Sequence, residues 1–182
     1  MKKLIICCCL VFYAIASQAQ NDSIPRNNFG KNEVKINALF LIIGAADLSY
    51  ERNFPESSVG ISVFVPFGYD DVDSNINYYI SPYYRIFFGK KYAGGFFIEG
   101  FGMLNSIQQE YYTSRDSYNI SEERITDFAL GFGVGGKWMT RSGFVFEVNG
   151  GIGRNLFNNK SDDYYDYSPI VGKLGFNLGY RF

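Results

Sequence analysis

The chain has 182 residues, of which 17 are basic and 18 acidic, it contains no histidine, and aromatic residues make up 19% of it. This length suits one domain, and the charge balance argues against a nucleic-acid partner, which would need a basic surface. The absence of histidine excludes Ser-His-Asp triads, Cys-His pairs and His-ligated zinc. We therefore predict a protein that is not an enzyme and has no catalytic residue, cofactor or bound metal.

The first 19 residues have the pattern of a signal peptide. Two lysines precede an apolar run over residues 4–16, and the small residues Ser17 and Ala19 suit cleavage before Gln20. The run is shorter than the roughly 20 residues that a spanning helix needs. All three cysteines lie within it, so the exported chain has no disulfide. We predict a signal peptide over residues 1–19 and a short periplasmic leader over residues 20–31.

From residue 32 to residue 182, apolar residues alternate with small, polar or charged ones, which is the period of β-strands. Between Asp127 and Trp138, one face is large and apolar and the other is mostly glycine or charged, so the second face cannot build a soluble core. We predict an all-β fold, a closed antiparallel up-and-down transmembrane barrel of eight strands with lipid outside and a polar lumen. The predicted strands cover residues 32–42, 45–53, 59–67, 76–88, 95–104, 126–139, 144–157 and 167–182.

The predicted connections alternate between short and long. The links at residues 53–58, 89–94 and 140–143 are short, and those at residues 68–75, 105–125 and 158–166 are longer. An even barrel with both termini in the periplasm has this arrangement, with the long links outside. The first link, near Ile43 and Gly44, is too tight for an outer loop, so either this hairpin is truncated or the first two strands are misplaced.

Aromatic residues mark the strand ends beside the short links, where rings sit well at the headgroup boundary of a membrane. We predict that they form an interfacial girdle. These residues are Phe54, Phe88, Phe96, Trp138, Phe144 and Phe182.

Charged residues of both signs fall on the face opposite the apolar one. An eight-stranded barrel is only wide enough for side chains, so we predict a paired polar network that fills the lumen. Carboxylate pairs such as Glu51 with Glu99 or Glu147 could do acid–base chemistry, but we favour a role as ion-pair partners of Arg85 and Lys137. The predicted network consists of Glu51, Arg85, Glu99, Lys137, Glu147 and Lys173.

Bulk is distributed unevenly on the same inward face. Large rings come from the fourth and fifth strands and glycines from the last three, so we expect the rings to lean toward a glycine wall. The rings are Tyr79, Tyr83, Phe97 and Phe101, and the glycines include Gly131, Gly133, Gly135, Gly151, Gly153, Gly175 and Gly179.

Two further motifs are best read as structural. Residues 131–136 satisfy GxGxxG, but they lie within a continuous alternating run instead of opening a helix. Asp71, Asp73 and Asn75 have the spacing that begins a calcium loop, yet the sixth and twelfth positions are not glycine and glutamate. We predict a solvated acidic loop there.

The last ten residues resemble the terminal-strand signal of bacterial outer-membrane barrels. A polar Lys173 is followed by Gly175 and then by Leu178, Tyr180 and the terminal Phe182. Residues 32–182 are similar in layout to the small eight-stranded barrels of the outer-membrane protein A and X type, including many uncharacterised outer membrane beta-barrel proteins. The resemblance implies the outer membrane of a Gram-negative bacterium, contact with its lipid and lipopolysaccharide, and recognition by the barrel-assembly machinery.

The long link over residues 105–125 mixes tyrosine with charge, a composition suited to binding surfaces. We predict a structural or surface-interaction role through extracellular loops that meet an unidentified extracellular partner. A narrow channel for ions or small solutes is the alternative. A soluble lipocalin-like carrier of an apolar ligand is a further one, and it would require the apolar face to point inward.

Overall fold

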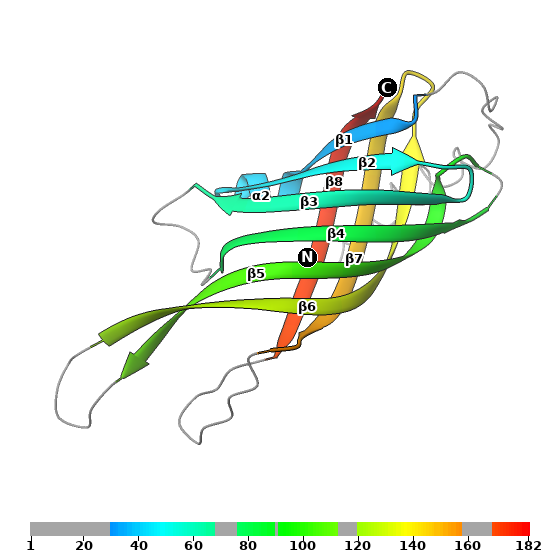
Figure 1. Ribbon diagram of the computed structural model, residues 1–182. Helices are drawn as coiled ribbons and strands as arrows, with labels where there is room; N and C mark the ends of the chain where they lie inside the picture. Colours follow the sequence, from blue (N-terminus) through cyan, green and yellow to red (C-terminus); the bar gives the residue numbers. More distant parts are fainter. Residues whose placement is uncertain (1–29, 68–75, 90, 113–119, 158–168) are drawn as a thin grey trace, which may run out of the picture.

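The computed structural model describes residues 30–67, 76–89, 91–112, 120–157 and 169–182. The predicted signal peptide and the calcium-like motif lie outside these residues. Within them, no helix is long and apolar enough to cross a membrane. Eight strands form a closed antiparallel barrel in which each pairs with its neighbours in sequence and β8 pairs with β1 (Figure 1). The predicted fold class is confirmed.

Most of the strands lie within three residues of their predicted bounds, and the larger departures concern β1, β5 and β6. The strands are β1 (Asn32–Asn37), β2 (Ala45–Asn53), β3 (Ser57–Pro66), β4 (Ile76–Phe88), β5 (Gly95–Tyr112), β6 (Ile120–Met139), β7 (Phe144–Asn155) and β8 (Ile170–Arg181).

The two ends of the barrel differ. The β2–β3, β4–β5 and β6–β7 connections are short and share one end, which we call the turn end. Asn32 and Phe182 also lie there, joined by two backbone hydrogen bonds. Gly143, at a φ of 91°, occupies the left-handed region that the tight turn before β7 requires. The strands of the β3–β4, β5–β6 and β7–β8 pairs reach the opposite end, the loop end, as the predicted alternation of connections requires.

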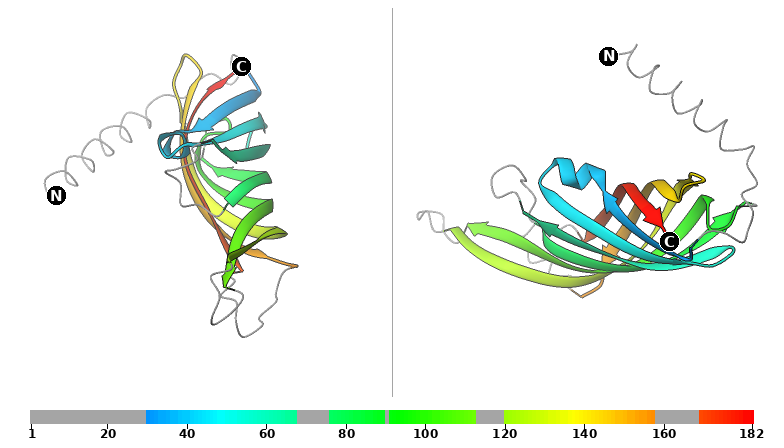
Figure 2. Two further views of the ribbon diagram at one scale, coloured as in Figure 1. Left: turned by 90° about the vertical axis from the view of Figure 1, so that its left-hand side faces the viewer. Right: turned by 90° about the horizontal axis from the view of Figure 1, so that it is seen from above.

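The first strand is shorter than predicted. β1 stops at Asn37, and residues predicted as strand form the single helical turn α2 (Ala38–Ile42) at the loop end (Figure 2). The side chain of Asn37 starts the turn by accepting a hydrogen bond from the Leu39 backbone N–H, at 3.2 Å. Residues 38–43 are all apolar, so the alternation that predicts a strand is missing there. The tight link is thus a truncated hairpin with a helical turn at its tip.

The predicted long link over residues 105–125 is largely strand, so that prediction is wrong. β5 and β6 stay paired from Asn105 and Asp127 up to Tyr112 and Ile120. β4 stops pairing with β5 at Ile107, and β7 stops pairing with β6 at Ala129. The two strands therefore continue past both neighbours as a separate hairpin (Figure 1). Residues 108–124 have no period-two alternation of apolar and polar residues, so the sequence does not predict strands there.

The apolar face points outward. Phe132 is 70% exposed, and Leu178 and Tyr180 are exposed on the same outer surface. The charged residues of the opposite face are buried inside the barrel. A lipocalin-like carrier needs the reverse arrangement, so this alternative is wrong.

Rings and glycines pack across the interior in the predicted manner. A Cβ at Gly131 would lie 2.3 Å from Cζ of Phe101 and 2.7 Å from the Ile152 carbonyl oxygen. A Cβ at Gly135 would lie 2.5 Å from Cζ of Phe97. The glycines of β6 are needed because these rings occupy the space that a side chain would fill.

Candidate functional site

A layer of buried ions crosses the interior in the half near the turn end. Seven of the eight strands contribute to it, and β3 supplies only serines. Many of the ion pairs join strands that are not neighbours, so they bridge the lumen. The members are Glu33 and Lys35 of β1, Glu51 of β2, Arg85 of β4, Glu99 of β5, Lys137 of β6, Glu147 of β7, and Lys173 and Arg181 of β8.

Glu51 is the centre of this layer. One of its carboxylate oxygens accepts hydrogen bonds from Lys35 and, at 2.8 Å, from Arg85. The same oxygen accepts the hydroxyl of Tyr83 at 3.0 Å, and the other oxygen accepts Lys137. A single carboxylate of β2 thereby holds side chains from β1, β4 and β6.

Glu147 and Glu99 extend the layer to the remaining strands. Glu147 accepts Lys35 at 2.7 Å and Arg85 at 2.8 Å. Glu99 accepts the Nε of Arg85 and the Nζ of Lys173, both at 2.6 Å. The Arg85 guanidinium also lies over the Tyr83 and Phe97 rings, at 4.3 and 4.4 Å from their centroids. Because its guanidinium binds three carboxylates and meets two rings, Arg85 fixes the layer in one geometry.

Glu33 joins the layer to the turn end. It accepts Lys137 at 2.9 Å and pairs with Arg181. The Arg181 guanidinium also donates to the Ala93 carbonyl oxygen, at 2.8 Å, in the turn between β4 and β5. This contact ties the last strand to a turn on the other side of the barrel.

The structure brings all six residues of the predicted network into this one layer. Lys35, Glu33 and Arg181 complete the ion pairs. Glu33 could have been found from the sequence, because Glu33, Lys35 and Asn37 continue the period-two spacing of the inward face.

The carboxylates are paired and are not presented to a substrate. Glu51 and Glu147 are fully buried, and each is held by two or more cations. Among the described residues, no group of three or more His, Cys, Asp or Glu side chains is arranged to hold a metal ion. What this arrangement can do is hold seven strands together and block the lumen.

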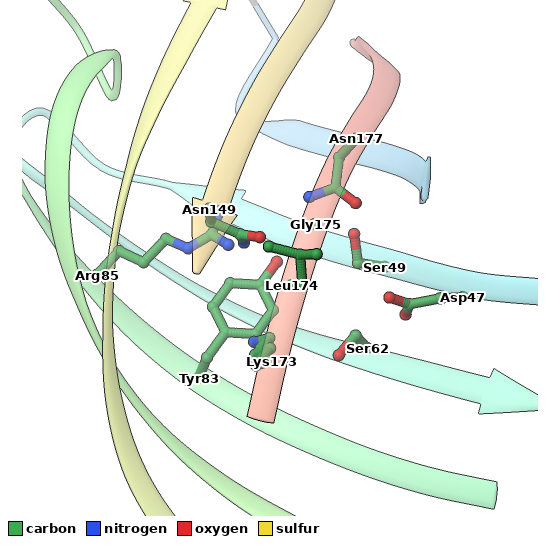
Figure 3. A pocket seen from close by; sticks show the side chains of 10 residues that line it. All are labelled: Asp47, Ser49, Ser62, Tyr83, Arg85, Asn149, Lys173, Leu174, Gly175 and Asn177. Atoms are coloured by element: carbon green, nitrogen blue, oxygen red, sulfur yellow. The ribbon is translucent and has the colours of Figure 1, made fainter. Parts of the chain in front are cut away.

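A small polar cavity lies next to the ion layer (Figure 3). Its volume is about 10 Å³, the room of a single water molecule. Asp47, Ser62 and Asn149 line it, and each has a buried oxygen with no hydrogen-bond partner among the described residues. The other Asp47 oxygen accepts the Tyr79 hydroxyl at 2.9 Å. This cavity is therefore too small for a hydrated ion.

The structure places the predicted interfacial aromatics around the turn end. Phe88 of β4 faces Phe96 of β5 with ring centroids 5.9 Å apart, and Phe144 of β7 contacts Tyr180 of β8 at 5.6 Å. Trp138 lies 6.0 Å from Phe146. Phe54 and Phe182 are exposed at the same end.

The predicted assembly signal lies along β8. Lys173 and Gly175 belong to the inner face, where Lys173 pairs with Glu99, while Leu178 and Tyr180 are exposed outside. Residues 177–181 pair with β1 and so close the barrel. The GxGxxG glycines lie within β6 and pair with β5 and β7, as the alternation predicts.

No protein-family model matches the sequence, and no curated protein matches it. Among solved structures, the chain is similar to the Yersinia pestis outer membrane protein Ail in a phospholipid bilayer nanodisc. That similarity has 16% identity, covers 84% of this chain and 99% of the other, and has a TM-score of 0.39. The closed up-and-down barrel, apolar outside and filled with charge inside, is itself the arrangement that spans a membrane with strands. The chain therefore has the fold of a small, closed eight-stranded transmembrane β-barrel.

Proposed function

We propose that this protein is a non-enzymatic, non-conducting barrel of the bacterial outer membrane that presents the β5–β6 hairpin at the cell surface. The observation that carries the proposal is the continuation of both strands past their neighbours. Among the described residues, the β4 ladder along β5 ends at Ile107 and the β7 ladder along β6 ends at Ala129, followed by one bond from the Leu156 N–H to the Phe128 carbonyl oxygen. The hairpin beyond these points lies past the barrel wall, where it can meet a segment of another protein.

The proposed orientation puts the turn end in the periplasm and the loop end outside the cell. It is supported by the short connections at the turn end, which are typical of the periplasmic side of such barrels. Export by the predicted signal peptide and recognition of β8 by the barrel-assembly machinery belong to the same proposal. The barrel then contacts outer-membrane lipid and lipopolysaccharide.

The ion layer supports a sealed lumen. Pairs such as Lys137 with Glu33 and Lys173 with Glu99 cross the interior, and each ion would have to lose its partner before a solute could pass. Purified protein in planar bilayers should give no current above the lipid background. Discrete conductance steps would favour the channel alternative.

Surface presentation is tested by shortening the hairpin. Gln109 and Glu123 face each other in the ladder, so residues 110–122 can be replaced by an Asn-Gly turn without changing the register. Cells with this variant should keep the barrel in the outer membrane, shown by heat-modifiable gel migration, and should lose attachment to surfaces or to other cells. Protease treatment of intact cells should cut the wild-type hairpin.

The matched control shortens the connection between β7 and β8, over residues 159–167, in the same way. This variant should attach like the wild type. Equal attachment by the hairpin variant would contradict the proposed role of the hairpin. Recovery of the wild type in the soluble periplasm would contradict the membrane location.

A further inference from the structure

The interior near the loop end holds a cluster of buried apolar side chains and a second cavity, of about 200 Å³. Phe40 of α2, Phe64 of β3, Met103 of β5 and Val171 of β8 line it. Phe64 stacks on Tyr79 at 5.0 Å and meets Phe40 edge to face at 5.1 Å, so its wall is well packed. A cavity of about 150 Å³ lined by apolar side chains binds benzene, so this one has room for a short alkyl chain.

One polar group in the cavity wall has an unused hydrogen-bonding atom. Asn105 is 3% exposed and lines the cavity. Its side-chain N–H donates to the Asn155 side-chain oxygen at 2.9 Å, while its own side-chain oxygen has no partner among the described residues. An unpaired buried acceptor is costly, and a ligand hydroxyl would satisfy it.

The cavity lies where the barrel wall changes. β8 pairs with β7 from Ile170 onward but pairs with β1 only from Asn177, so no described strand covers the β1 side of residues 170–176. α2 lies against this stretch instead. Ile43 and Ile170 line the cavity and are also exposed on the outside. In the proposed bilayer placement, the cavity wall at this seam therefore touches lipid.

We propose that this cavity binds the alkyl chain of a neutral amphiphile from the bilayer, with the ligand's hydroxyl donating to Asn105. The lining excludes a hydrated ion, because its side chains are mostly apolar. The Lys173 side chain also lines the cavity, but its ammonium is paired with Glu99, so a ligand needs no anionic headgroup to neutralise it. This inference rests on the proposed placement in a membrane.

Methionine methyl groups report on the cavity directly. Met103 lines it, whereas Met139 ends β6 at the turn end and is the matched control. In ¹³C-methyl-methionine protein folded in lipid nanodiscs, octan-1-ol should shift the Met103 signal to saturation and leave Met139 unchanged. Parallel, non-saturating shifts of both methyls would overturn the proposal, and so would an unmoved Met103.

Three variants locate the binding. Val171→Phe fills the cavity and should abolish the saturable shift, whereas Leu174→Phe adds bulk on the exposed face of the same strand and should preserve it. Asn105→Leu should weaken octan-1-ol binding by about fivefold, the value of one hydrogen bond. If Val171→Phe does not fold, Ile107→Phe replaces it as the filling variant.

The two proposals fail in different ways. A chain that does not incorporate into nanodiscs contradicts the membrane placement. A chain that incorporates and gives no saturable shift at Met103 contradicts the ligand site alone.

Discussion

The two halves of the barrel interior are built on different principles. Near the turn end, charges from seven strands meet in pairs, and every glutamate of the ion layer has at least two partners. Near the loop end, apolar side chains surround a cavity of about 200 Å³. Ion pairs and hydrogen bonds are directional and accept one geometry, whereas apolar contacts tolerate many. The turn-end half therefore fixes the strand register, and the loop-end half leaves space for the proposed ligand.

The largest effect should come from Glu51→Ala, which leaves Lys35, Arg85 and Lys137 without their shared carboxylate. Breaking a buried ion pair costs about 3–5 kcal/mol, because the remaining charge stays uncompensated. Urea unfolding in lipid vesicles should show a loss of this size or a failure to fold. The neighbouring Arg52→Ala, on an exposed side chain, should change stability by less than about 0.5 kcal/mol. Similar values for the two variants would mean that the buried ion layer contributes no more to stability than an exposed residue of the same strand.

A smaller effect is expected where rings meet the glycine wall. Gly131→Ala would push a methyl group into Phe101 and the Ile152 carbonyl, which should cost about 1–3 kcal/mol. Gly150→Ala is the control, because a Cβ there has no heavy atom within 4 Å. Urea unfolding gives the free energy of unfolding of both variants. Equal values would show that the packing around Gly131 can accommodate a methyl group.

The next effect on stability is expected at Asn37, where the pairing of β1 with β8 ends. Asn37 donates to the Leu174 carbonyl oxygen at 2.9 Å and accepts the Phe176 N–H at 3.2 Å, just where pairing between β1 and β8 ends. Asn37→Leu removes both bonds and should cost about 1–2 kcal/mol. Asn32→Leu, at the exposed start of the same strand, should cost less. An equal loss in both variants would argue against a special role for Asn37.

The smallest effect is expected inside the loop-end cavity. Val171→Ile adds one methyl group to free space and should raise stability by about 0.5 kcal/mol. The corresponding addition in the filled half, Ser81→Thr, should lower it, because Ser81 is fully buried. A destabilised Val171→Ile protein would mean that the cavity is tighter than its volume indicates.

Sequence patterns predicted the parts of the fold where one face meets lipid and the other the lumen. Strands such as β4, predicted and observed at residues 76–88, have this asymmetry over most of their length, from Tyr79 to Phe88. The pattern failed over residues 38–42, where every residue is apolar, and over residues 105–125, where the strands leave the barrel wall. Period-two alternation predicts a strand only where one face is apolar and the other is polar or small. It does not predict a strand where this difference is missing from the sequence.

The inward direction of the charged residues and part of their pairing were predictable. Alternation and charge predict that Glu51, Glu99 and Glu147 pair with Arg85 and Lys137, and the structure has such pairs. The pairing of Lys35 with Glu51 and Glu147 was not predicted, because such contacts depend on the stagger between strands. The apolar cluster near the loop end was not predicted, because its inward residues, such as Phe64, Met103 and Val171, are few and far apart in the sequence. Only the closed barrel brings them together.

Because part of β8 is paired on one side only, its two parts should differ in the rate of amide hydrogen exchange. Residues 177–181 are hydrogen-bonded on both sides. Among the described strands, the stretch from Ile170 to Phe176 is paired with β7 alone. Amide protons exchange with solvent through local opening, so the β1-facing amides of the second stretch should exchange sooner than those near the C-terminus. On heating, the barrel should then begin to open at Ile170, and the opening should stop where the Asn37 side chain bonds to the backbone of Leu174 and Phe176.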